Sequence, residues 1–516
     1  MANNYVGDRL SFDGELCTVR FLGPIPQWGS QVIAIGVEWD DPTRGKNNGS
    51  LNGVQYFHCR VNGSGSFLKS TRKPDPGMGF YEAVQERYLY SDEIECEPIM
   101  VGRSKKVETL GIDKLSRYHA HISSLEMISL SRNRIFRQGE MGSVRLDSLK
   151  RLDLSFNLFS SLHDIMKIIK PLTGLSSLIL NGNRFNDNCD SSENALYPIP
   201  HITELSLAST LLSPSQIELF LSSVFTSVKT LNLSGNLLES IPSGLLSDQG
   251  IAPFLQKLDL SWNYISDLTG ENESITSRSR LIELDLSHNR ITEVRADPLE
   301  SCEVLDLRSN LISDWASVDA VGRIKDLRSL RINNNPIINP TKSELGIGAD
   351  NKKEAQEREG NVEEEDNRLF VIARCPTIEK LNGSFIIDRE RTDAELYFMS
   401  KVASNKYDLG IRSSNNWKRL VAKHGEPTVS VTPAKENIKN RLLSLEVIYK
   451  SRKEKLMVLG TSSVQKLRLA VAKKFGLSPF DIILSQSDQI LDSDIDSIPR
   501  ALISDEPIIV QNIVEA

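Results

Sequence analysis

One nine-residue pattern recurs through the middle of the chain and limits how that region can fold. It reads LEMISLSRN at 125–133, LKRLDLSFN at 149–157 and LQKLDLSWN at 255–263. The last position of six further copies falls at residues 183, 210, 236, 289, 310 and 335, about 25 residues apart. In each copy two apolar residues alternate with polar ones, as Leu258 and Leu260 do, which predicts a short strand with one buried face. A unit of this size cannot bury that face alone, so stacked copies must share one continuous core.

The pattern resembles the leucine-rich repeat in its L-x-x-L-x-L-x-x-N form. The resemblance implies an α/β solenoid with a parallel sheet on its concave face. The Asn of each copy is expected to bond the backbone of the turn that follows the strand. Thr210 takes the place of Asn in one copy and can make only part of these bonds, so we expect that coil to be the loosest. Cys302 and Cys375 occupy apolar repeat positions, which favours core residues over nucleophiles.

The end of the repeat region also carries a signal. Residues 371–398 resemble the C-terminal cap of intracellular leucine-rich-repeat proteins, which covers the apolar area that a last coil would expose. We therefore assign 106–400 to the solenoid and its cap. Within it, 350–366 has eight acidic and three basic residues and no aromatic residue, so 340–367 is predicted to be a flexible acidic insertion. A solvated loop is one interpretation of this charge, and a docking site for a basic partner surface is the other.

The C-terminal part of the chain follows a different pattern. LLSLEVIYK and EKLMVL alternate like strands, an apolar stripe over 464–475 predicts a helix that Gly476 ends, and DIILSQ and EPIIVQNIV predict further strands. This order over 441–516 resembles the α+β ubiquitin-like β-grasp fold, although other small α+β folds share it. The final residues are not Gly-Gly, so we expect a folded module that binds proteins and is not conjugated to them. Residues 401–440 are predicted to be a linker.

The stretch GKNNG, from Gly45 to Gly49, follows a short apolar strand and places one lysine and two carboxamides between two glycines. It does not match a phosphate-binding P-loop, because Asn47 stands where that motif needs Ser or Thr. One interpretation is a hairpin turn, since Asn and Gly tolerate positive φ. The other is a loop that aims several donors at a ligand.

The surrounding sequence, 34–73, resembles a CAP-Gly domain. It contains an aliphatic-Gly-Val-Glu strand, the Gly-Lys-Asn loop, NGVQYF and GSFLK in that order. We assign 1–80 to a small all-β barrel of this family and 81–105 to a linker. The loop departs from the family at Asn48, where Asp is usual, so this loop is more cationic.

The resemblance implies a groove for acidic C-terminal tails that end in an aromatic residue, as on α-tubulin. Lys46 would meet carboxylates as a mobile point charge, and Asn47 and Asn48 would donate from their amides. Gly45 and Gly49 frame the loop. Aromatic side chains are predicted to wall the groove or to receive the aromatic residue of the tail, with packing in the domain core as the alternative: Trp28, Trp39, Phe57 and Phe67.

Charge and cysteine usage exclude several classes of protein. The net charge of −7 argues against a general nucleic-acid binder, although 1–75 has eight basic against seven acidic residues. The six cysteines are scattered singly without metal-ligand spacing, no run approaches the length of a membrane helix, and MANNYVGDRL lacks a signal-peptide core. No G-x-S-x-G is present, and GMG at 77–79 lacks the third Gly of a dinucleotide site. We therefore expect no enzymatic activity, no metal, no cofactor, and neither nucleic acid nor membrane as a partner.

The order of CAP-Gly, leucine-rich-repeat and ubiquitin-like domains resembles the tubulin-folding cofactor E family over nearly the whole chain. The resemblance implies a cytoplasmic, cytoskeleton-associated chaperone of α-tubulin. It implies cofactors C and D as partners in assembling the αβ heterodimer and cofactor B in dissociating it. Two alternatives stay open: a microtubule-end scaffold, and an adaptor that links tubulin to the proteasome through 441–516. The chain has no coiled-coil heptads or long basic linker, which argues against the scaffold.

Overall fold

The computed structural model describes most of the chain. The chain divides into two compact units, Met1–Pro427 and Thr428–Ala516, which we treat separately. The described residues are 5–29, 32–88, 99–101, 105–107, 122–142, 144–186, 196–246, 250–268, 280–295, 299–338, 367–404, 409–427, 442–459, 462–479, 481–486, 489–491 and 507–512.

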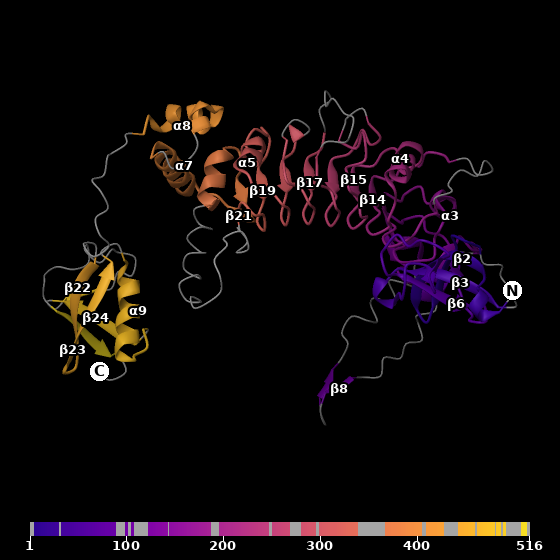
Figure 1. The fold of residues 1–516 in the computed structure, drawn as a ribbon, viewed down its shortest axis with the longest axis horizontal. Helices are drawn as coiled ribbons and strands as arrows, with labels where there is room; N and C mark the ends of the chain where they lie inside the picture. The colour runs from indigo at the N-terminus through magenta and orange to yellow at the C-terminus, as the bar shows by residue number, and fades with distance from the viewer. Residues whose placement is uncertain are drawn as a thin grey trace. The chain divides into compact units, whose positions relative to one another are not determined.

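The first unit begins with an all-β domain, as predicted (Figure 1). Its main sheet has the antiparallel order β1-β2-β3-β6. Alternation along the strands buries one face of this sheet, where Val19, Val37 and Trp39 form the domain core. The elements are β1 (Arg9–Phe12), β2 (Glu15–Pro24), η1 (Pro26–Trp28), β3 (Ile33–Trp39), η2 (Pro42–Arg44), β4 (Ser50–Leu51), β5 (Val54–Gln55) and β6 (Gly65–Lys69).

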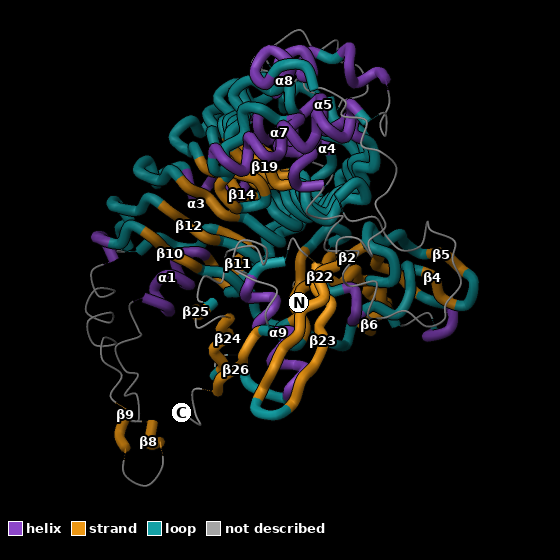
Figure 2. The backbone as a smooth tube through the Cα atoms, turned by 90° about the vertical axis from the view of Figure 1, so that its left-hand side faces the viewer, coloured by secondary structure: helices purple, strands orange, loops and turns teal. Residues whose placement is uncertain are grey.

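The repeats form a solenoid whose short strands stack into one sheet (Figure 2). Neighbouring strands are parallel and in register, so that Leu152 lies beside Leu178 and Leu205 beside Leu231, and each of these leucines is buried. We number the nine coils from the strand that begins each one. The strands of coils one to nine are β10 (Met127–Ser129), β12 (Arg151–Asp153), β13 (Ser177–Ile179), β14 (Glu204–Ser206), β15 (Thr230–Asn232), β16 (Lys257–Asp259), β17 (Glu283–Asp285), β18 (Val304–Asp306) and β19 (Ser329–Arg331).

The repeat asparagines form a buried ladder that joins successive coils. Asn236 donates from Nδ2 to the carbonyl oxygens of Leu233 in its own coil and Leu207 in the preceding coil, at 2.8 and 2.9 Å. Thr210 donates from its hydroxyl to Leu207 in its own coil at 2.8 Å, but it has no second donor for the preceding coil. The prediction that Thr210 replaces Asn only in part is therefore confirmed.

The N-terminal end of the solenoid is covered by a helix. Helix α1 (Phe80–Tyr88) buries Phe80, Tyr81 and Val84 in the solenoid core. Before it, β7 (Met78–Gly79) pairs in parallel with β11 (Ile135–Arg137). The prediction of a linker over 81–105 is therefore wrong for 81–88, because the apolar side chains of this segment cover the first coil. The remaining described strands of that range form a hairpin: β8 (Ile99–Val101) and β9 (Lys105–Val107).

The C-terminal end is covered by helices that extend past the predicted cap. Phe398 and Val402 of α7 pack against Trp417 and Leu420 of α8, so residues 409–424 belong to the covering layer and are not the linker predicted for 401–440. The acidic insertion predicted at 340–367 lies outside the described residues except for its last one. The elements here and between the repeats are α3 (Leu162–Ile169), α4 (Pro214–Ser223), α5 (Trp315–Val321), β20 (Lys380–Leu381), β21 (Ser384–Phe385), α7 (Asp388–Ala403), η6 (Leu409–Ser413) and α8 (Asn415–His424).

The described residues of the second unit form a five-stranded mixed sheet and one helix. The sheet order is β23-β22-β26-β24-β25, and β22 and β26 are its parallel pair. The predicted helix is present: Ser463 caps its start and Gly476, with φ of 70°, ends it. Val447 and Leu467 lie in the core between helix and sheet. The elements are β22 (Leu442–Tyr449), β23 (Arg452–Leu459), α9 (Val464–Phe475), β24 (Ile482–Gln486), β25 (Gln489–Ile490) and β26 (Ile508–Asn512).

Candidate functional site

The loop from Gly45 to Gly49 is held in place by two backbone contacts that leave no room for a side chain. A Cβ at Gly45 would collide with the carbonyl oxygen of Gly63. A Cβ at Gly49, where φ is 85°, would collide with the carbonyl oxygen of Phe57. The loop therefore has a fixed conformation. The two glycines allow the backbone at Gly63 and Phe57 to lie against it.

The side chains of the loop divide into two roles. Asn47 accepts from the Gly49 N–H at 2.9 Å, and Asn48 accepts from the Gly63 N–H and donates to Asn62. These bonds hold the loop together through the oxygen of Asn47 and through the oxygen and nitrogen of Asn48. Asn48 thus uses its amide within the loop, whereas donation to a ligand from Asn47 Nδ2 stays a prediction. Lys46 is exposed, and its ammonium has no ion-pair partner in the part of the chain that the structure describes. Within the described residues, the Lys46 ammonium and the Asn47 amide nitrogen are thus the loop groups that are available to a ligand.

Beside the loop lies a cluster of aromatic rings on the outer face of the sheet. Phe67 contacts Phe57, Tyr56 and Phe21 edge to face, with ring centroids 5.3, 5.5 and 6.5 Å apart. Phe57 is only 6% exposed because it packs over Gly36, so it supports the cluster from below. Phe67 is half-buried and presents part of its ring to solvent.

The prediction that Trp39 flanks the groove is wrong. Its side chain is 4% exposed and lies in the domain core, 6.3 Å from the ring of Phe12. Alternation does place Trp39 on the face of Ile35 and Val37, but that face is the buried one. The outer face of β3 carries Gly36 and Glu38 instead. Trp28, the fourth predicted aromatic residue, is half-buried.

The available groups line up along β6. Backbone N–H groups of Lys46 and Asn47 donate to the Gly65 carbonyl at 2.7 and 3.1 Å, which fixes the loop at the start of this strand. At its other end Lys69 is exposed, with its ammonium 6.0 Å from the ring centroid of Trp28. Phe67 lies between them on the same face as Lys69. At about 3.3 Å per residue, the strand separates the two cationic ends by roughly 13 Å.

One residue that positions this site was not predicted from the sequence. The carboxylate of Glu38 is almost fully buried and accepts from Arg20 Nε at 2.8 Å and from the backbone N–H groups of Arg60 and Val61 at 2.7 and 3.0 Å. It thereby orders the segment that bonds to Asn48. The available signal was an acidic residue inside the apolar strand AIGVEW, since a buried charge needs partners.

The β-domain is docked on the solenoid through a buried charge cluster. Arg9, whose side chain is fully buried, donates to both oxygens of Asp40 at 2.5 and 2.6 Å. Arg184 of coil three lies 4.0 Å from Asp40 on the other side. Burial raises the pKa of Asp40, but Arg9 and then Arg184 outweigh it, and the pKa lies below its usual range. Burial lowers the pKa of Arg184 to about 10.

Two hydrogen bonds extend this docking. Arg9 Nη2 donates to the carbonyl of Asn157 at 3.4 Å, and Arg60 Nη1 donates to the carbonyl of Leu211 at 3.0 Å. Asp40 is five residues before Gly45, so the charge cluster fixes the start of the loop segment. The loop segment therefore has a defined place on coils two to four.

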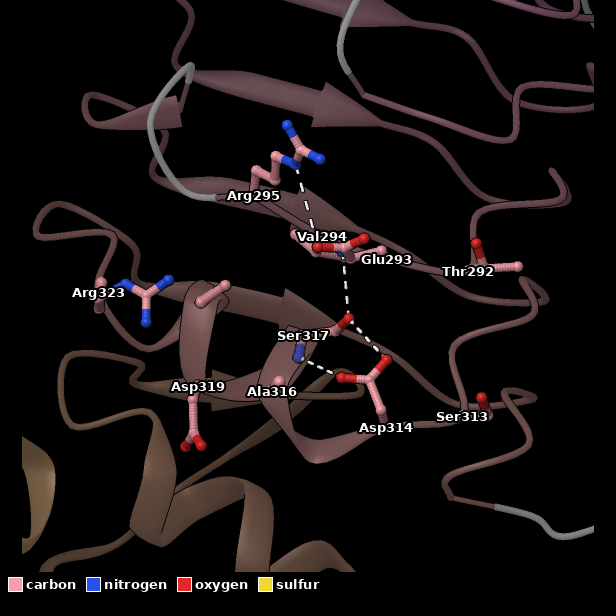
Figure 3. Close-up of a pocket in the computed structure, with 11 residues that line it drawn as sticks. Thr292, Glu293, Val294, Arg295, Ser313, Asp314, Ala316, Ser317, Asp319 and Arg323 are labelled. Atoms are coloured by element: carbon pink, nitrogen blue, oxygen red, sulfur yellow. Dashed lines mark hydrogen bonds and ion pairs between the residues drawn. The ribbon is translucent and has the colours of Figure 1, made fainter. Parts of the chain in front are cut away.

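The solenoid also has a polar pocket next to α5 (Figure 3). Asp314 accepts from the Ser317 N–H at 2.8 Å and caps the helix, and the hydroxyl of Ser317 accepts from the Val294 N–H at 3.1 Å. Asp319 binds Arg374 of the C-terminal layer at 2.6 Å through both oxygens. These bonds give Asp314, Ser317 and Asp319 structural roles.

Three of the described cysteines are buried and unreactive. Burial raises the pKa of the Cys17, Cys302 and Cys375 thiols to about 12, so they stay neutral. This confirms Cys302 and Cys375 as core residues. Among the described residues, no group of three or more His, Cys, Asp or Glu could hold a metal ion. No helix in the described ranges is long and apolar enough to cross a membrane.

Comparison with known families identifies two of the parts. The model of the CAP-Gly domain matches residues 6–73, and the model of the leucine-rich repeat matches residues 280–302. The first match covers β1 to β6 and therefore the whole of the loop and the line of side chains along β6.

Similarity to individual proteins extends along most of the chain. The chain is 29% identical to "Protein PAC2" of Saccharomyces cerevisiae over 93% of this chain and 89% of the yeast protein. It is 26% identical to the tubulin-specific chaperone E of Bos taurus over 94% of this chain and 92% of the bovine protein. It is 30% identical to the tubulin-folding cofactor E of Arabidopsis thaliana over 76% of this chain and 72% of the plant protein. The resemblance thus includes both the β-domain and the solenoid.

Proposed function

Because the chain belongs to the tubulin-folding cofactor E family, we propose that it binds α-tubulin and takes part in assembling and dissociating the αβ-tubulin heterodimer. The family assignment rests on the plant relative, which is 30% identical and of which the chain covers 72%. A non-enzymatic role as a tubulin-folding chaperone follows from that assignment and the CAP-Gly domain. The site of action would be the cytoplasm, in association with the cytoskeleton.

The observation that carries the proposal is the line of side chains along β6. Lys46 and Lys69 provide a positive charge at each end, and the partly open ring of Phe67 lies between them. Carboxylates favour the ends of such a groove and an aromatic side chain favours its middle. This chemistry suits the acidic, aromatic-ended tail of α-tubulin.

The groove alone is expected to bind weakly. A disordered tail loses conformational entropy when it is ordered in a small site. Contact between the solenoid and the folded body of the same molecule would raise the effective concentration of the tail and strengthen the whole complex. Capture at two points therefore explains why a tail-binding domain is joined to a long solenoid.

The partners of the later steps are the other tubulin-folding cofactors. We propose cofactors C and D for assembly of the heterodimer and cofactor B for its dissociation. Residues 441–516 would act as a ubiquitin-like protein-binding module, which the sheet order of the second unit and helix α9 support. Binding of this module to the proteasome stays an alternative.

The groove can be tested with the full chain and a fluorescent peptide of the α-tubulin tail. A shielded charged hydrogen bond contributes about 1.5–3 kcal/mol, so Lys46→Ala should weaken binding about tenfold or more. Removing the terminal aromatic residue of the peptide should cost a similar factor, and binding should weaken as salt rises. Lys418→Ala removes the same charge on the exposed surface of α8 and should bind as the parent does. If Lys46→Ala and the trimmed peptide bind like the originals, the groove assignment is wrong.

A further inference from the structure

One edge of the solenoid is formed by the residues on either side of each repeat Asn. The residue before the Asn has a positive φ in every coil. The residue after it occupies an equivalent place from coil to coil. We call these two rows the Asn rim. Its members in coils one to nine are Arg132 and Arg134, Phe156 and Leu158, Gly182 and Arg184, Ser209 and Leu211, Gly235 and Leu237, Trp262 and Tyr264, His288 and Arg290, Ser309 and Leu311, and Asn334 and Pro336.

In coils two to four the Asn rim is covered by the β-domain. Arg184 lies beside Asp40, and only 13% of its side chain is exposed. The carbonyl of Leu211 accepts from Arg60. This part of the rim is therefore an intramolecular docking surface.

In coils six to eight the same rows are open and carry three exposed apolar side chains. Trp262 is 63% exposed, Tyr264 40% and Leu311 49%. The ring of Trp262 stacks on His288, with centroids 3.9 Å apart and planes 9° apart. The guanidinium of Arg290 lies 4.1 Å from the ring centroid of Tyr264 and forms no ion pair within the described ranges.

These features are typical of a binding surface. Trp, Tyr and Arg are enriched in the residues that contribute most to protein interfaces. The stacking holds the exposed rings in place before a partner arrives, so little side-chain freedom is lost on binding. Exposed aromatic side chains gathered on adjacent coils need such an explanation, whereas single exposed apolar residues do not.

We propose that the Asn rim of coils six to eight receives the folded body of α-tubulin while its tail lies in the groove of the β-domain. This rests on the proposed function, which supplies the identity of the bound protein. The residues concerned are Trp262, Tyr264, His288, Arg290 and Leu311.

Continuity with the docked β-domain supports this occupant. Strands of a sheet lie about 4.8 Å apart, so the rim of coil six begins roughly 10 Å beyond coil four, where Arg60 is bound. A folded domain of ordinary size spans tens of ångströms, and one molecule can reach both places. The cation of Arg290 also has the same sign as Lys46 and Lys69, so both surfaces select an acidic partner.

The concave face of the same coils is less suited to an acidic partner. Asp259, Asp285 and Asp306 lie side by side there on adjacent strands. Burial, and after it the neighbouring carboxylates, raise the pKa of Asp285 against the effect of its hydrogen bonds with Ser287. Asp306 is bound by Arg308 at 2.8 Å, so that cation is already paired. The rim, where Arg290 has no ion-pair partner among the described residues, is the better surface.

The test uses the full chain with two rim variants. Trp262→Gly introduces the residue that coils three and five carry at the equivalent position, and Tyr264→Ala removes a second exposed ring. Both changes should leave the fold intact. Phe254→Ala is the matched control, because Phe254 is 48% exposed and lies off the Asn rim. Each protein is titrated with intact tubulin heterodimer, with tubulin lacking the α-tail, and with the tail peptide alone.

We expect each rim variant to weaken binding of intact and tail-less tubulin about tenfold or more and to leave peptide binding unchanged. Phe254→Ala should bind all three ligands as the parent does. If the peptide binds normally and the rim variants hold intact tubulin like the parent, the rim assignment is overturned while the groove stands. If the parent does not bind the peptide at all, the proposed function fails instead. Sedimentation that shows a parent dimer converted to monomer by Trp262→Gly would assign the rim to a second copy and also overturn the inference.

Discussion

In coils two to four and in coils six to eight the Asn rim has the same positive φ at the residue before the repeat Asn or Thr, but its two parts have opposite surroundings. In the early coils Arg184 is nearly buried beside the Arg9–Asp40 pair. In the later coils Trp262 and Tyr264 are open to solvent. The repeat therefore determines where the edge lies, and the residues that the repeat leaves free determine what the edge binds. The rim of coils two to four already binds a folded protein domain. This indicates that the open rim of coils six to eight is suited to bind one too.

The largest effect is expected where the early rim is broken. Asp40→Ala leaves the fully buried Arg9 without its counter-charge, and breaking a buried pair in this way costs about 3–5 kcal/mol. Urea unfolding and limited proteolysis between the β-domain and the solenoid would measure this loss. The matched change on the open rim, Arg290→Ala, should alter stability by less than about 0.5 kcal/mol. Equal effects from the two variants would contradict the comparison.

A second prediction concerns the boundary between the covered and open coils. Asn236 accepts from the N–H groups of Thr210 and Leu211 and donates to two buried carbonyls. Asn236→Ala should cost about 2–3 kcal/mol, because these groups lose their partners in the core. Thr210→Asn should stabilise the chain by about 1 kcal/mol, since it supplies the donor that coil four lacks. Thermal unfolding measures both, and a destabilising Thr210→Asn would show that coil four has adapted to Thr.

A third prediction concerns the pH dependence of the C-terminal layer. This layer is held by the buried carboxylate of Glu395, as the docked β-domain is held by that of Asp40. Glu395 accepts from Arg419 at 2.9 Å and from Lys423 and His424 at 2.7 Å. Burial raises the pKa of Glu395, but its hydrogen bonds with Lys423, His424 and Arg419 outweigh it and lower the pKa to about 2 from 4.5.

A depressed carboxyl pKa gives stability that is present above the unfolded pKa and lost as the pH falls. The contribution of Glu395 should therefore be complete above pH 4.5 and disappear between pH 4.5 and about 2. Glu395→Gln should cost about 2 kcal/mol at pH 7, because its cationic partners are partly exposed, and should flatten the acid limb of the stability curve. A variant with an unchanged acid limb would show that other groups control acid unfolding.

The smallest effect is expected at the edge of the docked surface. Arg60→Ala removes the hydrogen bond to the carbonyl of Leu211 and should cost about 1 kcal/mol of docking. Arg60 adjoins the segment that holds Asn48, but it contacts Glu38 there through its backbone N–H, which the substitution keeps. Tail-peptide binding should therefore change less than twofold. A large loss of peptide affinity would mean that docking on coil four shapes the groove itself.

The sequence predicted those features that depend on short-range patterns. Repeat leucines such as Leu258 alternate within one strand, and the limits of α9 follow from Ser463 and Gly476, so both were predictable from neighbouring residues. The loop and its glycines were found for the same reason. The core positions of Cys302 and Cys375 followed from the repeat register.

Features that depend on which surfaces meet were not predictable. Alternation placed Trp39 on the correct face of β3, but only the packing of Phe12 and Val19 shows that this face is buried. Arg9, Asp40 and Arg184 are far apart in the chain, and no spacing rule joins them. The segment 81–88 was assigned to a linker because its apolar residues lacked a visible partner until the first coil was placed beside them. The ubiquitin-like assignment of 441–516 stays a prediction.

The central claim is that the groove and the open rim hold one tubulin molecule together, and amide hydrogen exchange tests it most directly. Exchange would be followed in the full chain alone, with the tail peptide and with intact heterodimer. We expect the peptide to protect the amides of residues 45–69 only from exchange. The heterodimer should protect 45–69 and also 260–268 and 286–294. Protection by intact heterodimer that is confined to 45–69 would contradict it.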